Sequence, residues 1–487
     1  MKKNAIESIE NLKTQEGNCR PQLKQKNSSK LREIFLEWSK RSSVDCYGKI
    51  FEYETHSVRV VWLFIFVASV SFTAFIVNNT IMEYFDHEVV SQIRVVYEKP
   101  VEFPAVTICN NNPFTTKEAR EIFLQNYYVP MYKDIISWPH ALKLFKMLAS
   151  ETESLSDETR KSFGLNMDNI QKCTYGGVEC KNDLHWYWSF EFGNCFQFNV
   201  GLNLTNNEIN RKYSRLEGMN DGLKIEIFPF TIDNEWSKFQ YDFGFVVFVH
   251  NSSFRPTMSD AVMVRPGEAT HISIARTFIS NTPFPYSSCK ELTAYNSHFY
   301  TFILNSPQLM AYRQRDCFNL CMQVNILKTC GCFFTGFDMP LAKNITRPCL
   351  NLTDYTCYTK VISEFDPIAC ETESCPLQCE YVEYNKVVSG HLAPHHSYYS
   401  NPLNAEEWPP FNFTTPIIYQ EWVTLFCTIY VYYDTLSYTQ ISELPKISLV
   451  DLITNIGGSM TLIVSLSIFS LIELVELFCL ILNAFLF

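Results

Sequence analysis

Small, polar and acidic residues recur along the apolar C-terminal segment, residues 449–487. Those spaced three and four apart, which share one face of a helix, are Asp451, Thr454, Gly458, Thr461 and Ser465. Two glutamates one turn apart, Glu473 and Glu476, follow further along. Helix packing accounts for glycine and serine but not for the acids, which inside a membrane usually face water or a partner. The pattern therefore favours the lining of a water-filled cation path.

Two apolar segments are long enough to cross a bilayer. Residues 58–79 carry a single charge, Arg59, and begin too far from the N-terminus for a signal peptide. Residues 449–487 would extend about 55 Å as one helix, which exceeds the thickness of a bilayer. We therefore expect this second segment to project outward, to break at Gly457-Gly458 or in the serine-rich stretch behind them, or both. Because two spans cannot enclose a pore, a channel of this kind needs several copies of the chain.

Flanking charges and glycosylation signals indicate an orientation. Residues 1–57 hold eleven Lys and Arg against eight Asp and Glu, which favours a cytoplasmic N-terminus. Sequons for N-glycosylation lie between the two apolar segments, at Asn203, Asn251, Asn344, Asn351 and Asn412. We expect a plasma-membrane protein with two spans, both termini in the cytoplasm and residues 80–448 outside the cell.

The cysteines support an oxidising environment for that outer segment. Fourteen of the 18 lie between positions 109 and 379, at Cys109, Cys173, Cys180, Cys195, Cys289, Cys317, Cys321, Cys330, Cys332, Cys349, Cys357, Cys370, Cys375 and Cys379. An even number in such a compartment predicts seven disulfides. Zinc binding is disfavoured because these cysteines form no CxxC pair and have no histidine at ligand spacing. Cys427, in an apolar stretch, is expected to be a buried free thiol.

Composition and missing motifs exclude other classes of protein. With 47% hydrophobic and 19% charged residues the chain is not disordered, and a net charge of −11 argues against nucleic acid as a partner. No GxSxG, P-loop, HExxH or GxGxxG motif occurs, so we expect no enzyme activity and no cofactor. A run of histidines, His391, His395 and His396, lies among Pro, Ser and Tyr, which indicates a solvated loop instead of a metal site.

The outer segment shows both helical and strand patterns. Helical periodicity covers residues 115–165, and residues 300–370 are expected to form a helical lobe joined by disulfides. Segments rich in β-branched and aromatic residues are 223–230, 243–250, 270–275 and 422–438. We expect these strands to form one sheet, with turns at Asn251 and at Pro266-Gly267. The expected fold class is α+β.

Four sequence blocks together resemble the degenerin/epithelial sodium channel family. They are FPAVTICNNNPF (Phe103–Phe114), CFNLCMQVNILKTCGCFFTGFDMP (Cys317–Pro340), CPLQCEYVEYN (from Cys375) and GGSMTLIVSLSIFSLIELVE (Gly457–Glu476). The likeness runs from about Tyr47 to Glu476 and is closest in style to acid-sensing and invertebrate peptide-gated sodium channels. It implies a trimer in which each subunit has a clenched-hand ectodomain, with a β-sheet palm and a helical thumb and finger, between two transmembrane helices.

The resemblance also implies roles for individual residues. Its disulfide pairs would be Cys109–Cys195, Cys173–Cys180, Cys289–Cys379, Cys317–Cys375, Cys321–Cys370, Cys330–Cys357 and Cys332–Cys349. Its pore-lining and gate positions would be Asp451, Thr454, Asn455, Gly458 and Thr461, and Thr461 also takes the amiloride-site position. The selectivity filter falls on Ser465-Leu466-Ser467, where the family usually has Gly-x-Ser. The cytoplasmic His-Gly gating motif appears as Tyr47-Gly48, and Glu473 and Glu476 would be inner-pore acids. From the residues alone, Asp451 could equally be a helix cap.

These observations predict a subunit of a trimeric, sodium-preferring cation channel, with Ca²⁺ as a second candidate permeant ion. We expect an extracellular ligand to open it. A neuropeptide is our first choice and protons the second, with Glu364 and Asp366 as candidate acid sensors. Homotrimers, heterotrimers with sister subunits, membrane lipid and amiloride-type blockers are the expected partners. The remaining alternative is a membrane-anchored receptor or adhesion ectodomain without a pore.

Overall fold

The structure is a computed structural model. It describes residues 33–53, 55–112, 115–123, 156–189, 192–228, 244–291, 312–334, 349, 352–392 and 426–486. The chain divides into two compact units. The first, here called the helical unit, comprises Met1–Val90 and Pro445–Phe487, and the second, the disulfide-rich unit, comprises Ser91–Leu444.

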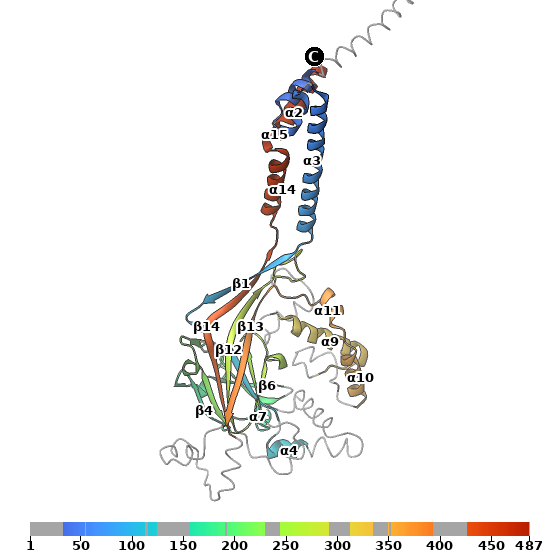
Figure 1. Ribbon diagram of the computed structural model, residues 1–487. Coiled ribbons are helices and arrows are strands. Elements are labelled where there is room, and N and C mark those ends of the chain that lie inside the picture. The colour runs from blue at the N-terminus through green and yellow to red at the C-terminus, as the bar shows by residue number, and fades with distance from the viewer. Residues whose placement is uncertain are drawn as a thin grey trace, which may run out of the picture. The chain divides into compact units, whose positions relative to one another are not determined.

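The helical unit is organised around α3 (His56–Phe85), which is longer than the predicted span 58–79. Among the described residues, α3 is the one helix long and apolar enough to cross a membrane, and α14 (Leu449–Val464) is a shorter apolar helix. The two helices lie side by side (Figure 1). Residues 33–41 are also helical, and α2 (Asp45–Glu52) packs against α3.

The C-terminal apolar segment breaks where the serines lie. α14 ends at Val464 and α15 (Ile468–Leu486) begins after three intervening residues. The alternative break at Gly457-Gly458 is wrong, because both glycines lie within α14, where a helix tolerates glycine at a cost of about 1 kcal/mol each. Ser465 adopts a left-handed conformation with φ 57°, and its N–H donates to the Thr461 carbonyl at 3.1 Å. A left-handed residue of this kind ends a helix while still satisfying its last carbonyl groups.

The disulfide-rich unit contains a seven-stranded sheet. Its order is β13 (Glu380–Leu392), β12 (Glu268–Ser280), β14 (Cys427–Pro445), β9 (Leu223–Ile227), β4 (Ile170–Tyr175) and β5 (Val178–Glu179), with β1 (Val89–Tyr97) also paired to β14. β12 runs parallel to β14 and antiparallel to β13. Three of the four predicted strands therefore belong to this sheet.

The fourth predicted strand lies elsewhere, so the expectation of one sheet is wrong. β10 (Phe245–His250) is an interior strand of a separate antiparallel sheet, with the order β11 (Ala261–Val264), β10, β3 (Ala105–Asn110), β7 (Gly193–Phe198) and β6 (Leu184–Ser189). Every residue of β10 is buried, as expected for a continuous apolar strand that is covered on both faces. Val247 of β10 and Ile429 of β14 belong to one hydrophobic core shared by the two sheets. A short pair, β2 (Val101–Glu102) and β8 (Tyr213–Ser214), completes the strands.

The predicted helical lobe is confirmed for the part that the structure describes. Its helices are α9 (Gln314–Cys330), α10 (Leu352–Ser363) and α11 (Pro367–Glu373). Within the predicted helical region 115–165, α4 (Lys117–Phe123) and α7 (Asp157–Lys161) form, and residues 124–155 lie outside the described residues. Single 3-10 turns occur at η2 (Lys181–Asp183), η3 (Met219–Asp221) and η5 (Met258–Asp260).

Seven disulfides join these elements, and their pairs are those that the resemblance implies. They are Cys109–Cys195, Cys173–Cys180, Cys289–Cys379, Cys317–Cys375, Cys321–Cys370, Cys330–Cys357 and Cys332–Cys349. Four of them hold the helical lobe, whose small apolar cores are built around the cysteines themselves. Cys427 is a buried free thiol, as predicted, and burial raises its pKa to about 12.

Candidate pore segment and its contacts

One face of α14 presents polar side chains to its surroundings. The predicted pore residues on it, all exposed, are Asp451, Thr454, Asn455, Gly458 and Thr461. Thr454 Oγ1 donates to the Val450 carbonyl at 2.7 Å, so that side chain satisfies its hydrogen bond within its own helix. Thr461 Oγ1 lies 2.8 Å from the Gly457 carbonyl and 3.1 Å from that of Leu466. This polar face of α14 is therefore exposed in the single chain.

Asp451 forms a reciprocal cap with Ser448 at the start of α14. Its carboxylate accepts from the Ser448 N–H at 3.1 Å and from the Ser448 hydroxyl at 2.6 Å, while its own N–H donates to Ser448 Oγ at 3.1 Å. This capping box satisfies N–H groups that a helix start leaves free. Asp451 is therefore a helix cap, one of the two roles that its sequence position allowed. An additional role at a pore mouth stays a prediction.

Ser465, Leu466 and Ser467 separate the two helices. The expectation that Ser465 continues the polar face of α14 is wrong, because its left-handed backbone turns it out of the helical repeat. Ser467 and Ser470 cap α15 reciprocally, with N–H to hydroxyl distances of 3.2 and 3.4 Å. Non-helical backbone and hydroxyl groups are thus gathered at one level of the segment, which is what a cation filter requires.

Residues near the N-terminus hold Glu473 in place. The Ser43 N–H donates to Glu473 Oε2 at 2.9 Å, and Trp38 Nε1 donates to the Glu473 carbonyl at 3.0 Å. The Ser43 and Ser470 hydroxyls lie 2.7 Å apart. Sequence reasoning missed Trp38 and Ser43. A tryptophan between Glu37 and Lys40, close before the first apolar segment, was a signal for the first, and nothing in the sequence marked the second. Glu476 lines a nearby cavity of about 360 Å³ within the helical unit.

The Tyr47-Gly48 pair lies in α2. Tyr47 contacts Phe66 of α3 with ring centroids 5.6 Å apart, and its hydroxyl lies 3.3 Å from Ser39 Oγ. A β-carbon at Gly48 would lie 3.6 Å from the Ser39 carbonyl oxygen, an ordinary contact distance. Tyr47 therefore packs α2 onto α3, and space alone does not demand glycine at position 48.

Other predicted positions in the disulfide-rich unit have local roles. Glu364 lies 4.0 Å from Lys360, and the Asp366 carboxylate accepts from the Ile368 N–H at 2.9 Å, so each candidate acid sensor has its own neighbour. His391 lies in β13, so the prediction of a loop is wrong for this residue. Its ring stacks on that of His271, with the two ring centroids 5.3 Å apart. His395 and His396 are outside the described residues, within which no cluster of three metal-ligating side chains occurs.

Two predicted glycosylation sites are described. Asn203 Oδ1 accepts from the N–H groups of Thr205 and Asn207 in a turn, and Asn251 Oδ1 accepts from the Ser253 N–H. Asn344, Asn351 and Asn412 lie outside the described residues. Modification at these positions stays a prediction.

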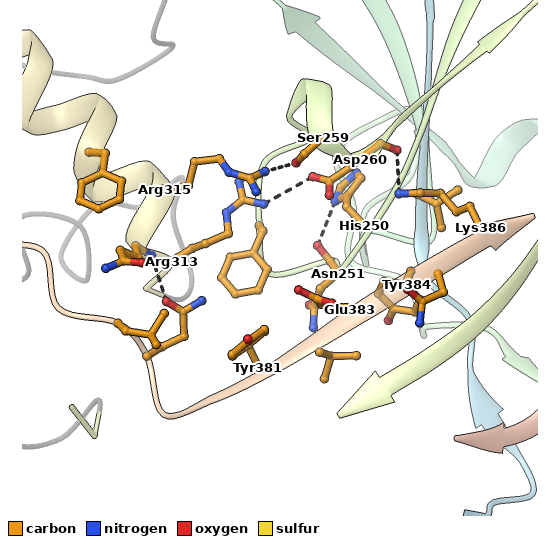
Figure 2. A pocket seen from close by; sticks show the side chains of 18 residues that line it. His250, Asn251, Ser259, Asp260, Arg313, Arg315, Tyr381, Glu383, Tyr384 and Lys386 are labelled. Atoms are coloured by element: carbon orange, nitrogen blue, oxygen red, sulfur yellow. Dashed lines mark hydrogen bonds and ion pairs between the residues drawn. The ribbon is translucent and has the colours of Figure 1, made fainter. Parts of the chain in front are cut away.

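The disulfide-rich unit also contains a cavity of about 640 Å³ (Figure 2). Its walls are formed by the end of β10 with the loop that follows and η5, by the start of α9, and by β13. Basic and aromatic side chains line it. Its volume falls in the range of small-molecule sites.

The chain combines a disulfide-rich α+β unit, the long apolar helix α3, and the helix α14 with a polar face and a break at its end. These are the features expected of an ion-channel subunit. A family model described as "Amiloride-sensitive sodium channel" matches residues 38–477. The chain therefore belongs to the amiloride-sensitive sodium channel family, the degenerin/epithelial sodium channel family of the sequence analysis, whose members are ion channels.

Several relatives match most of the chain at low identity. The bile acid-sensitive ion channel of Mus musculus is 25% identical over 441 residues, which cover 86% of this chain and 82% of that one. Acid-sensing ion channel 1A of Danio rerio is 22% identical, over 89% and 85% of the two chains. The FMRFamide-activated amiloride-sensitive sodium channel of Cornu aspersum is 21% identical, over 62% of this chain and 48% of that one.

Proposed function

We propose that this chain is one subunit of a trimeric, sodium-preferring cation channel of the plasma membrane. Residues 58–79 and 449–487 would span the bilayer, with both termini in the cytoplasm. The observation that carries the proposal is the exposed polar face of α14 ending in the Ser465–Ser467 break, in a chain that belongs to a sodium channel family. A membrane anchor needs only an apolar helix and has no use for either feature.

The arrangement of α14 supports assembly from several copies. One chain contributes α3 and α14, which cannot surround a path, and the polar face of α14 remains exposed in the single subunit. Copies of Asp451 at the outer end would concentrate cations. Carbonyl and hydroxyl oxygens at the break would replace part of the ion's water shell. Sodium is the proposed permeant ion, with calcium as a second candidate.

An extracellular neuropeptide is the proposed opening ligand, and protons are the alternative. The relatives named above carry names that specify a peptide, acid and bile acid as their stimuli. The peptide is favoured over protons because Glu364 and Asp366 interact with separate neighbours instead of pressing together. Residues outside the N-terminal 57 are strongly acidic in sum, which suits a cationic peptide.

Two-electrode recording from oocytes that express the chain tests this function. Amidated peptides are applied first, then acid, each with and without amiloride and with external sodium replaced by a large organic cation. We expect a peptide-evoked inward current that disappears without sodium. Acid-evoked current alone would favour the alternative ligand. Surface-labelled protein that passes no sodium current with either stimulus, alone or with sister subunits, would support the receptor alternative and contradict the proposal.

A further inference from the structure

The 640 Å³ cavity of the disulfide-rich unit contains cationic side chains without a carboxylate partner among the described residues. Figure 2 shows Arg313 and Arg315 on one side of Asp260 and Lys386 on the other. The carboxylates that line the cavity are Asp260 and Glu383. Arg313 is balanced by Asp260 and by Asp316 beside the cavity, so Lys386 and Arg315 are the cations left to bind an anion. The histidine in the wall adds no charge while it is neutral. His250 is fully buried there, and burial lowers its pKa to about 4.

Lys386 brings an ammonium group into this cavity from β13. Its Nζ donates to the Asp260 backbone carbonyl at 3.3 Å, and it forms no ion pair with any carboxylate among the described residues. Burial lowers the pKa of Lys386, and the nearby Asp260 carboxylate acts in the opposite direction. A half-buried ammonium with a neutral acceptor gains more from an anion than a solvated one does.

Arg315 supplies a second cation from the first turn of α9. Its guanidinium donates to Thr257 Oγ1 at 3.1 Å and to Ser259 Oγ. These hydroxyl groups orient the guanidinium but do not neutralise it, and the described residues include no carboxylate paired with it. A planar guanidinium held in this way can bind a carboxylate with two parallel hydrogen bonds.

The acidic groups of the cavity do not cancel these two cations. The Asp260 carboxylate accepts from the Thr257 hydroxyl at 2.8 Å and lies 3.5 Å from Arg313, whose guanidinium also binds Asp316 at 2.9 Å. Asp260 is thus engaged by its own neighbours. Glu383, which is exposed on β13, is the carboxylate that would oppose an anionic ligand.

Aromatic side chains line the same space. Phe254, Phe318 and Tyr381 are among the lining residues, and the guanidinium of Arg313 lies 5.2 Å from the Phe254 ring centroid. Apolar walls with a few charged groups are the usual composition of a small-molecule site. We propose that this cavity binds an amphipathic organic carboxylate. The carboxylate would contact Lys386 and Arg315, and the apolar body would contact Phe254, Phe318 and Tyr381. This binding is separate from the proposed opening by a peptide or by protons, so it can be measured without a current.

Isothermal titration of the full chain in detergent tests the proposal, with 1-naphthaleneacetate as the probe. The matched control ligand is 1-naphthaleneacetamide, which keeps the ring system and removes the charge. Because the predicted glycosylation site Asn251 also lines the cavity, all proteins carry Ser253→Ala, which removes the sequon and keeps the asparagine. We expect the carboxylate to bind at least about tenfold more tightly than the amide.

Charge variants test the position of the ligand. Lys386→Gln and Arg315→Gln should each weaken carboxylate binding, by about tenfold for Lys386, whereas Glu383→Gln should strengthen it by about threefold. Arg265→Gln, which removes an exposed cation outside the cavity, should change nothing. The proposal is overturned by absence of saturable binding, by equal affinities for acid and amide, or by affinities that Lys386→Gln and Glu383→Gln leave unchanged. The ligand comparison and Glu383→Gln remain decisive if a cation variant fails to fold.

Discussion

Lys446 and Glu88 are joined twice. The Lys446 N–H donates to the Glu88 carbonyl at 2.9 Å, and the Lys446 ammonium donates to the Glu88 carboxylate at 2.7 Å. Glu83, in the last turn of α3, provides a second carboxylate 2.9 Å from the same ammonium. The hydrogen bonds to Glu88 and then Glu83 raise the pKa of Lys446. Within the helical unit, this contact ties the end of α3 to the residues that lead into α14.

Reversal of the Lys446 charge should loosen this tie. Lys446→Glu places three carboxylates together, whereas Lys446→Glu with Glu88→Lys restores an attractive pair. We expect the single variant to change the ligand concentration for half-maximal current by a few fold and the double variant to return it toward the original value. Because the groups are exposed, the difference should shrink at high ionic strength. Equal effects of single and double variants would show that the ion pair does not influence gating.

The left-handed backbone at Ser465 predicts a sharp difference between two substitutions. Ser465→Gly should preserve the break and ion selectivity, because glycine adopts φ near 57° without a steric penalty. Ser465→Val should disrupt it, because a β-branched residue is strained there by roughly 1–2 kcal/mol. The measurement is the reversal potential in sodium and potassium solutions. If valine is as well tolerated as glycine, the break does not set selectivity.

Ser467 should contribute to ion selection through its oxygen atoms. Ser467→Ala is expected to lower the sodium-to-potassium permeability ratio, because a hydroxyl that can replace ion hydration is lost. Ser459→Ala is the matched control, since its hydroxyl bonds to the Asn455 carbonyl within α14. Reversal potentials that are the same in both variants would place the filter elsewhere.

Charge and capping can be separated at the start of α14. Asp451→Asn removes the charge and keeps an oxygen acceptor for the Ser448 N–H, whereas Ser448→Ala removes the hydroxyl cap and keeps the charge. If copies of Asp451 form an acidic ring, Asp451→Asn should lower single-channel conductance, most clearly at low ionic strength. Ser448→Ala should instead lower surface expression, through a loss of roughly 1 kcal/mol of helix stability. Reduced conductance in neither variant would leave Asp451 as a cap alone.

A bulky residue at Thr454 should favour the open channel. Thr454 is exposed on the polar face of α14, where copies would approach one another in a closed trimer. Thr454→Phe or Thr454→Lys should destabilise that packing and produce a standing current without ligand. Ile453→Phe, one position away on a different face, is the control for general disturbance. Surface-expressed Thr454 variants without standing current would refute this register of the pore helix.

His250 predicts an acid-dependent loss of stability in the disulfide-rich unit. Thr107 Oγ1 lies 2.8 Å from His250 Nε2 and itself accepts from Gln197, so the hydroxyl donates to an unprotonated nitrogen. His250 Nδ1–H donates to the Asn251 carbonyl at 2.9 Å. Burial is the main cause that lowers the pKa of His250 to about 4, with Arg313 adding to it and Asp260 opposing it. The folded state thus holds a neutral ring that the unfolded state protonates near pH 6.5.

Because the pKa of His250 is lower in the folded state than in the unfolded state, acid destabilises the folded state. The contribution of neutral His250 to the free energy of unfolding is fully present above pH 6.5. It is lost as the pH falls toward 4, by about 3 kcal/mol in all. His250→Gln should therefore show a smaller drop in Tm between pH 7.5 and 4.5 than the original chain. His391→Gln, which changes an exposed histidine, is the control. Parallel Tm profiles for all three proteins would contradict this assignment.

Local sequence patterns determined much of this protein. A long apolar run forms a helix such as α3 because its backbone must satisfy its own hydrogen bonds, whatever lies beside it. Apolar β-branched runs likewise predicted β9, β10, β12 and β14. The cysteine pattern, through the family it resembles, implied all seven disulfides. These properties depend on neighbouring residues along the chain or on a motif that the sequence carries intact.

Other features were decided by the tertiary structure alone. Gly457-Gly458 and Ser465–Ser467 offered equal break points by propensity, and β10 could not be assigned to a second sheet from its own residues. Ser43 meets Glu473, and Lys386 approaches Asp260, through contacts between segments far apart in the chain. Strand pairing and helix packing bring such residues together, because the free energy of these contacts depends on the whole fold and leaves no periodic trace in the sequence.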